Sequence, residues 1–323
     1  MKRLAFLLAL AAAALSVSSA SATDWPNRPV RIVNTFAVGG AADVLARTVA
    51  EQLSAAFGQQ FFVETRAGAA GSIGVQTVIA SPPDGYNFVI TNLSLLALLP
   101  VSNPKLGFDP KRDLTNVAYI AGTPIVLSVN PSRGFKTLEQ FLSHAKSSPK
   151  PMTYSSSGVG SNGHLLAETF AFKTGIKVEH VPYKGAAQGL TDLVGGHIDF
   201  SSQTVASTSG QLRGGGLAGL AVTTAERLPD YPTIPTFKEL GHPELVSTTW
   251  FSLSGPAGLP KDIVDKVNRE VVRAMEKPEV QERLRRDGMI AVPMSAEEFG
   301  RFIDEETARY KPAIERAGLI GKQ

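Results

Sequence analysis

A strand, a pair of glycines and a helix follow one another near the start of the chain, and this order limits the fold more than any other feature. Residues 29–34 alternate and are β-branched, as in a strand. Apolar residues then recur at helical spacing from Val44 to Phe57, and Gly58 can end that helix in the left-handed conformation. Gly39 and Gly40 lie between the two elements and have no Cβ to keep a bound group away from the backbone.

The amides at the start of this helix are predicted to bind an anion. The first amides of a helix have no partner within it, and they carry a partial positive charge. A strand, a bare glycine pair and a helix N-terminus together therefore favour an anion site. The alternative to an anion site is a tight turn in which the glycines serve only the backbone geometry. Short motifs of this kind often occur without a ligand.

The same alternation continues along the chain. Strands are expected at residues 60–65 and 86–91, and a second glycine loop, residues 68–74, lies between them. Its G-x-x-G-x-x-G spacing matches neither the dinucleotide fingerprint nor the phosphate loop. Strands that alternate with helices predict parallel pairing with helices on both faces of the sheet. Pro312 is expected to kink or end the last helix.

The length and two interruptions predict a two-domain chain. A chain of 323 residues has room for two domains of ordinary size. The apolar run 117–129 is broken at Gly122 and Pro124, which favours a strand, a crossover and another strand. Trp250 opens a segment that reads as the return strand to the first domain. We therefore expect domain junctions near these two places.

Residues 1–22 have the features of an export signal. Lys2 and Arg3 precede an apolar stretch, residues 4–15, and Ala20 to Ala22 form a small-residue cleavage site. We expect cleavage after Ala22. The apolar stretch is too short to span a membrane, and no cysteine follows it that could carry a lipid. The mature protein is therefore expected to be periplasmic and not membrane-anchored.

Composition excludes several classes of function. The absence of cysteine rules out disulfides, thiol catalysis and cysteine-based metal sites. Without Lys2 and Arg3 the chain has 30 basic and 29 acidic residues, a net charge of +1. A near-neutral chain without a basic stripe does not favour nucleic acid. The five histidines are scattered, so neither a metal site nor any cofactor is expected.

A third glycine loop leaves an enzymatic alternative open. Residues 158–163 fit G-x-G-x-x-G between a predicted strand and helix, and Glu179 follows at about the distance of a ribose-binding acid. This pattern is compatible with an exported or misread NAD-dependent oxidoreductase. The export signal argues against it, because free nicotinamide cofactor is scarce outside the cytoplasm. The serines of the loop favour an anion site or simple helix capping instead.

A series of motifs gives the chain a family resemblance. In order they are Trp25-Pro-Asn-Arg-Pro, Phe36-Ala-Val-Gly-Gly-Ala-Ala-Asp43, Glu64-Thr-Arg-Ala-Gly-Ala-Ala-Gly-Ser-Ile-Gly74, Pro83-Asp-Gly-Tyr, Tyr154-Ser-Ser-Ser-Gly-Val-Gly-Ser161, His180-Val-Pro-Tyr-Lys-Gly185, Gly195-Gly-His-Ile-Asp199, Trp250-Phe and Gly255-Pro-Ala-Gly-Leu-Pro. Over the whole mature chain this series resembles the extracytoplasmic solute-binding receptors of the tripartite tricarboxylate transporter family, also called Bug receptors.

The resemblance implies a fold and a function. The fold is an α/β, two-lobed periplasmic-binding-protein-like fold of type II, in which each lobe is a mostly parallel sheet flanked by helices. Lobe 1 would comprise residues 23–122 plus 247–323, and lobe 2 residues 123–246. The implied function is capture of a small carboxylate and its delivery to the large and small membrane subunits of a transporter, without catalysis. A periplasmic module that reports the ligand to a signalling partner is a further alternative.

The resemblance also implies a set of ligand-binding residues in the cleft between the lobes. Lobe 1 would contribute Phe36, Ala37, Gly39, Gly40, Asp43, Ala69, Ala70, Asn92 and Ser94. Lobe 2 would contribute Ser155, Ser156, Ser157, Gly158, Ser161, His164, Asp199 and Gln203. The polar stretch 201–208 follows a predicted strand and is expected to border the cleft. No acidic residue follows Asp199 closely, so a ligand with an amino group is not favoured.

The loops of the expected site lack cationic side chains. Residues 36–43, 68–74, 91–95 and 155–164 contain neither Lys nor Arg, and Asp43 is their only full charge. We therefore expect two helix N-termini, one from each lobe, to supply the positive potential. Asp43 is expected to hold the loop amides and to pair with Arg47. His164 would either donate to the carboxylate or cap its helix.

Overall fold

A computed structural model describes residues 25–316, 318 and 320–321. The expected export signal at residues 1–22 and its cleavage site lie outside the described residues. Within them, no helix is both long and apolar enough to cross a membrane.

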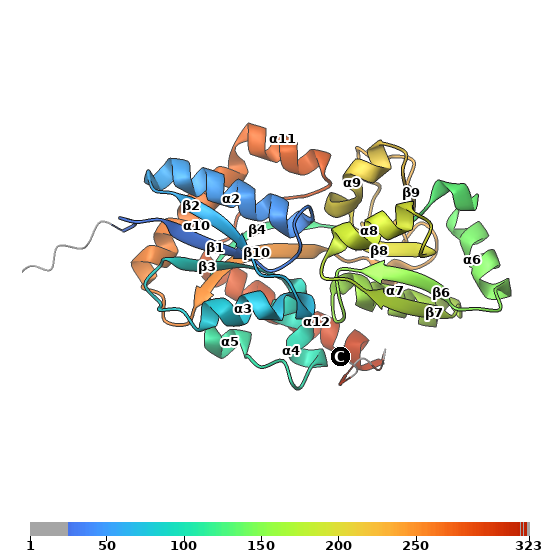
Figure 1. The fold of residues 1–323 in the computed structure, drawn as a ribbon, viewed down its shortest axis with the longest axis horizontal. Helices are drawn as coiled ribbons and strands as arrows, with labels where there is room; N and C mark the ends of the chain where they lie inside the picture. Colours follow the sequence, from blue (N-terminus) through green and yellow to red (C-terminus); the bar gives the residue numbers. More distant parts are fainter. Residues whose placement is uncertain (1–24, 317, 319, 322–323) are drawn as a thin grey trace, which may run out of the picture.

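The described chain folds into two lobes, each built on its own five-stranded sheet (Figure 1). The elements of the first lobe up to the first crossing are β1 (Val30–Asn34), α2 (Ala41–Phe57), β2 (Phe61–Thr65), η1 (Ala69–Gly71), α3 (Ser72–Ile79), β3 (Asn87–Asn92), η2 (Ser94–Leu98), α4 (Leu99–Ser102), α5 (Pro110–Asp113) and β4 (Leu114–Thr123). Those after the return are β10 (Thr249–Pro256), α10 (Lys261–Glu276), α11 (Pro278–Arg286) and α12 (Ala296–Arg316).

The second lobe contains the middle of the chain. Its elements are β5 (Ile125–Val129), η3 (Pro131–Arg133), α6 (Leu138–Ser147), β6 (Met152–Ser156), α7 (Asn162–Thr174), β7 (Val178–Pro182), α8 (Ala186–Val194), β8 (Phe200–Thr204), α9 (Val205–Arg213), β9 (Ala218–Val222) and η4 (Pro243–Leu245). The chain therefore passes between the lobes twice, at Pro124 between β4 and β5 and again between β9 and β10.

Both sheets are mixed and follow the same plan. The strand order is β2-β1-β3-β10-β4 in the first sheet and β7-β6-β8-β5-β9 in the second. The strands of the strand–loop–helix units pair in parallel, as expected: β1 with β2 and β3, and β6 with β7 and β8. The strands that follow the crossings, β10 and β5, pair antiparallel to both of their neighbours. Parallel pairing therefore brings the ends of β1, β3, β6 and β8 to the side where the lobes meet.

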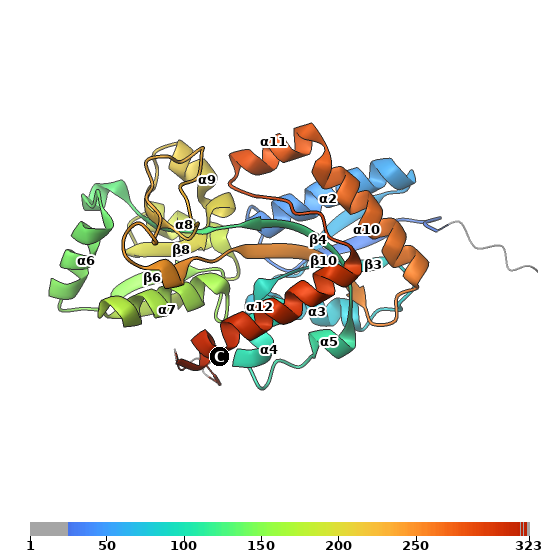
Figure 2. The same ribbon diagram turned by 180° about the vertical axis from the view of Figure 1, so that it is seen from behind.

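Helices cover both faces of the first sheet. In Figures 1 and 2, α2 and α10 lie on one face, and α3 and α12 lie on the other. Gly58 ends α2 in the left-handed conformation, with φ 66°, as its sequence predicts. Pro312 does not end α12, which continues to Arg316. An interior proline removes one helix hydrogen bond, and its ring crowds the carbonyl four residues earlier, so a kink at Pro312 stays a prediction.

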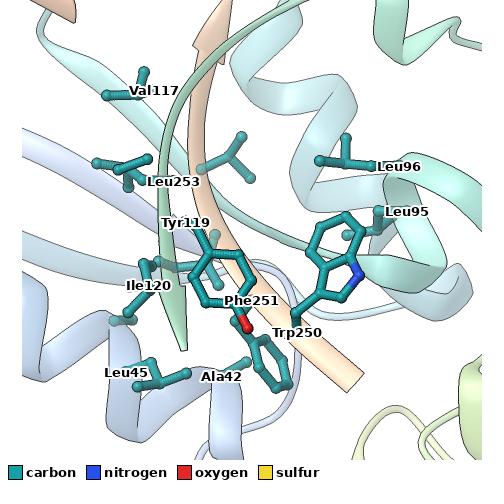
Figure 3. Close-up of a cluster of buried hydrophobic side chains, with 14 of the residues drawn as sticks. Ala42, Leu45, Leu95, Leu96, Val117, Tyr119, Ile120, Trp250, Phe251 and Leu253 are labelled. Atoms are coloured by element: carbon teal, nitrogen blue, oxygen red, sulfur yellow. The ribbon is translucent and has the colours of Figure 1, made fainter. Parts of the chain in front are cut away.

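The apolar core of the first lobe surrounds the paired strands β4 and β10. Figure 3 shows Trp250 and Phe251 of β10 together with Ile120 of β4, Leu45 of α2 and Leu95 of η2. Trp250 is completely buried, and its indole Nε1–H donates to Glu306 of α12 at 3.1 Å. The strand that returns from lobe 2 is thus anchored in the core of lobe 1.

Candidate binding site

A pocket lies between the lobes, where loops from both sheets face each other. It is narrow, with a cavity volume of about 30 Å³, and it is partly open to solvent. The residues that line it are Phe36, Gly40, Ala41, Ala42, Asn92, Ser94, Ile125, Ser157, Asn162, Gly163, Ala186, Ser202, Gln203, Thr204, Ser207, Thr249 and Phe251. Its place beyond the carboxyl ends of parallel strands is where open α/β sheets bind ligands.

Two helices, one from each lobe, begin at this pocket. Ala42 is the second residue of α2, and Gly163 is the second residue of α7. Within the described residues, neither of these two amides has a protein acceptor. Unpaired amides at helix N-termini carry partial positive charge. The pocket therefore has one free helix amide on each wall, as the two-helix hypothesis requires.

Buried side chains of lobe 2 add hydrogen-bonding groups that have no partner. Ser202 Oγ and Gln203 Nε2 are at most 2% exposed, line the pocket and have no acceptor or donor within the described residues. Ser155 Oγ, in the neighbouring strand β6, is also buried and unpaired. Leaving such a group unsatisfied costs about 1–3 kcal/mol. A bound molecule with acceptor atoms would remove part of that cost.

The pocket is electrically neutral in its side chains. None of its described lining residues is ionisable. Asp43 lies behind the wall, where it accepts from the amide of Gly39 at 3.2 Å and pairs with Arg47 at 3.1 Å. Both expected roles of Asp43, holding the loop and pairing with Arg47, are thus confirmed. The carboxylate is buried, and its charge is compensated within lobe 1 instead of facing the pocket.

Two histidines stiffen the serine loop of lobe 2 from behind. His164 Nδ1 accepts from the amide of Gly160 at 3.1 Å, and His180 Nε2 lies 2.8 Å from Ser156 Oγ. The two rings stack with their centroids 4.3 Å apart. Burial lowers the pKa of His164, and burial together with the neighbouring His164 lowers the pKa of His180 to about 3. Both rings are therefore neutral near pH 7, and His164 serves the loop as an acceptor.

The structure brings some of the predicted site residues together and leaves others apart. Those that line the pocket are Phe36, Gly40, Asn92, Ser94, Ser157 and Gln203. Those that lie just beneath its walls are Asp43, Ser155, Ser156, Ser161 and His164. Ala37 and Gly39 lie at the seam between the lobes: the amide of Ala37 donates to the Lys184 carbonyl at 3.2 Å, and a Cβ on Gly39 would meet Ala187 at 3.8 Å.

A second recess contains three of the predicted residues. Ala69, Ala70 and Gly158 line it, and its cavity volume is about 450 Å³, partly open to solvent. A Cβ on Gly158 would lie 3.6 Å from Ala70 Cβ, so the two lobes touch at this point. Lys105 of lobe 1 and Lys184 of lobe 2 are on the same lining, and no acidic residue is among its described members.

Asp199 is not at the pocket. It accepts from the amide and the hydroxyl of Thr153, and it pairs with Arg133 at 3.0 Å. It directly precedes β8, whereas Gln203 and Thr204 at the end of that strand line the pocket. Four residues of a strand span roughly 13 Å. The motif therefore identified the correct strand, but Asp199 lies at its opposite end.

Several lining residues were not among the predicted ones. They are Ala41, Ala42, Ile125, Asn162, Gly163, Ala186, Ser202, Thr204, Ser207, Thr249 and Phe251. The expected helix N-termini comprise the first residues of α2 and α7, which were not predicted individually. The polar stretch 201–208 was expected to border the cleft, and it does so through Ser202, Gln203, Thr204 and Ser207. Ile125 and Thr249 belong to the crossing strands and had no distinguishing signal. Phe251 stands in the Trp250-Phe motif, which was not assigned to the site.

The G-x-G-x-x-G loop does not form a dinucleotide site. A Cβ on Gly163 would lie 2.2 Å from the Ser202 carbonyl oxygen, so this glycine is needed for packing α7 against β8. Glu179 pairs in register with Thr153 near the start of β6, while the glycine loop follows the end of that strand at Ser156. A ribose-binding acid would need to lie at the other end of β7.

Comparison with known proteins decides the family. Residues 45–319 match the model of the tripartite tricarboxylate transporter family receptor. The chain belongs to this receptor family. It is 30% identical to the protein BugT of Bordetella pertussis over 299 residues, which cover 92% of each chain. The tripartite tricarboxylate transporter receptors are periplasmic solute-binding proteins and not enzymes, so the oxidoreductase alternative is not supported.

Solved structures of relatives have the same fold as this receptor. A Rhodopseudomonas palustris protein solved with adipate is 34% identical, with a TM-score of 0.88, over 91% of this chain and 98% of that chain. The protein MatC of the same organism, solved with bound malate, is 28% identical, with a TM-score of 0.85, over 90% of this chain and 100% of that chain. The two-lobed α/β fold expected for this receptor is thereby confirmed.

Proposed function

We propose that this receptor captures a small carboxylate in the pocket between its lobes and delivers it to the large and small membrane subunits of a tripartite tricarboxylate transporter. The observation that carries the proposal is the pair of free amides of Ala42 and Gly163 on facing walls of a pocket whose described lining residues are not ionisable. The proposed binding residues are the predicted ones that line the pocket, together with these two amides and Ser202.

The proposed interactions are strong enough for useful affinity. A hydrogen bond to a charged group contributes about 1.5–3 kcal/mol, and micromolar binding needs about 8 kcal/mol. Four or five bonds from Ala42, Gly163, Ser202 and Gln203 to carboxylate oxygens reach that range after the cost of closure. Because these donors belong to both lobes, only a closed form can make all of the bonds. Ligand binding would therefore shift the hinge toward closure.

The class of ligand follows from the relatives and from the apolar part of the lining. Relatives of this receptor have been solved with adipate and with malate, which are aliphatic dicarboxylates. Phe36, Ile125 and Phe251 offer apolar contact for a short carbon chain between two polar ends. We therefore propose that the ligand is a small aliphatic dicarboxylate and not an aromatic acid.

The proposal also includes the export of the chain and the bounds of its two lobes. We propose export to the periplasm with cleavage after Ala22. We also propose that lobe 1 comprises residues 23–122 and 247–323 and that lobe 2 comprises residues 123–246. This division is supported by the membership of β4 and β10 in one sheet and of β5 to β9 in the other.

Titration calorimetry on the mature protein tests the function. The panel would contain adipate, malate, the diamides of both acids, and NAD. The proposal predicts micromolar or tighter binding of at least one acid and at least 100-fold weaker binding of its uncharged diamide. Equal affinity for acid and diamide, or binding of NAD alone, would contradict it.

A further inference from the structure

Two serines cap helices that belong to the opposite lobe. The amide of Ala41, the first residue of α2, donates to Ser207 Oγ of lobe 2 at 3.0 Å. The amide of Asn162, the first residue of α7, donates to Ser94 Oγ of lobe 1 at 3.1 Å. Each lobe thus supplies one helix N-terminus and one serine that meets the helix of the other lobe. Both bonds require the lobes to be in contact.

The hydroxyl protons of the two serines remain available. Ser207 Oγ accepts a second hydrogen bond, from Thr204 Oγ1 at 2.9 Å, so its acceptor positions are filled. Within the described residues, neither Ser94 nor Ser207 donates its hydroxyl proton to a protein acceptor. Both residues line the pocket. An oxygen that accepts from a helix N-terminus is polarised, which strengthens its own O–H as a donor.

We infer that Ser94 and Ser207 couple ligand capture to closure of the lobes. Each hydroxyl holds the helix of the opposite lobe through its oxygen and donates its proton to an anionic acceptor in the pocket. The two serines therefore hold part of the protein closed before ligand arrives, and a carboxylate strengthens that state. The ligand part of this inference rests on the proposed function, whereas the closure part does not.

Coupling of the serines to the ligand and competition of Ser207 with the ligand predict opposite effects when the hydroxyl is removed. If Ser207 merely occupied the N-terminus of α2 in place of the ligand, its removal would free the amide of Ala41 and tighten carboxylate binding. If the serines couple capture to closure, a variant without either hydroxyl lacks one donor to the ligand and one hydrogen bond between the lobes. Binding then weakens and the open form gains population.

A spin-label distance measurement on the full mature chain tests this inference. The protein has no cysteine, so the exposed pair Glu51→Cys on α2 and Lys146→Cys on α6 can carry labels without side reactions. Distance distributions would be recorded during titrations with adipate and with malate, beginning without ligand. Ser94→Ala and Ser207→Ala would be compared with Ser132→Ala, an exposed serine outside the pocket.

The expected result is a two-part change in both variants. The open population grows without ligand, and the ligand concentration needed for half-closure rises roughly five- to tenfold relative to Ser132→Ala. Distributions that do not differ from those of Ser132→Ala, or tighter binding by Ser207→Ala, would overturn the inference. So would a wild-type protein without a closed population at any concentration. If the wild type has a closed population without ligand but neither acid enlarges it, the choice of ligand fails, while the ligand-free distributions still decide the closure part.

Discussion

A methyl group on Gly163 would lie 2.2 Å from the carbonyl oxygen of Ser202. This close approach seats the first turn of α7 against the middle of β8. It also brings the free amide of Gly163 and the unpaired hydroxyl of Ser202 into the same wall of the pocket. The glycine that completes the G-x-G-x-x-G pattern therefore serves helix–strand packing at the proposed anion site.

Gly163→Ala should damage both the fold and the site. The added methyl meets backbone, so α7 has to move, at a cost of about 1–3 kcal/mol in unfolding free energy. The free amide moves with it, and we expect carboxylate affinity to fall at least tenfold. Gly210→Ala in α9 is the control, because a Cβ there meets nothing within 4 Å. Urea unfolding and calorimetry measure both effects, and an unchanged Gly163→Ala protein would show that the packing is not tight.

Gln203→Glu should abolish capture while keeping the shape of the side chain. The change replaces an unpaired buried donor, Nε2, with a carboxylate in a pocket that has no cationic residue among its described lining. We expect affinity for a dicarboxylate to fall at least 100-fold, about 3 kcal/mol, at neutral pH. Gln281→Glu on the exposed surface of α11 makes the same change in charge outside the pocket. If both variants bind equally well, Gln203 does not face the ligand.

His180 should make the fold sensitive to acid. Burial and the neighbouring His164 hold the pKa of His180 at about 3 in the folded state, below the value of about 6.5 for a free histidine. The unfolded chain therefore binds a proton that the folded chain does not, and stability falls as pH drops from about 6.5 toward 3. The slope from one histidine is at most about 1.4 kcal/mol per pH unit.

His180→Gln isolates this contribution. Every other ionisable group is present in both proteins, so the difference between their stability–pH curves reports His180 together with its coupling to His164. We expect the variant to have the flatter curve between pH 6.5 and 4.5 in urea unfolding experiments. Curves that run parallel over that range would mean that His180 titrates as it does in the unfolded chain.

Lys105 and Lys184 should speed the arrival of an anionic ligand. They come from different lobes and line the recess beside the pocket, without a described acidic neighbour on that lining. Clefts of one charge sign raise association rates, and salt weakens the effect. Replacing both lysines with Gln should slow association roughly threefold at low salt.

Stopped-flow measurement of the association rate of a dicarboxylate ligand, at low and at high salt, measures the contribution of the two lysines. Lys150→Gln, at an exposed position between α6 and β6, is the control for the loss of a positive charge. The difference between the double variant and the wild type should disappear at high salt, because the charges are then screened. A difference that persists at high salt would indicate a direct contact instead of steering.

The sequence predicted the elements better than it predicted how the two lobes meet. The β-branched strand, Gly58 and the helical spacing of α2 are local signals, and each led to the observed element. The break at Pro124 placed the first crossing between β4 and β5. Asp199 was assigned to the cleft because it belongs to a recognised motif. The direction of β8 puts it at the far end of the strand, and no local pattern states that direction.

Contacts between lobes were beyond the reach of the sequence. Ser207 is separated from Ala41 by 166 residues, and nothing near either residue identifies the other as its partner. The same holds for Ser94 and Asn162, which are 68 residues apart. Ala69 and Ala70 share a glycine-rich loop with the expected site, yet they line the neighbouring recess. The helix N-termini were predictable because a free amide is a property of any helix start.

A crystal structure of the mature protein grown with adipate or malate would show which groups hold the ligand. We expect carboxylate oxygens within hydrogen-bond distance of the amides of Ala42 and Gly163, with the hydroxyls of Ser94 and Ser207 directed at the ligand. A carboxylate seated on Lys105 and Lys184, with the two helix amides facing only water, would contradict it.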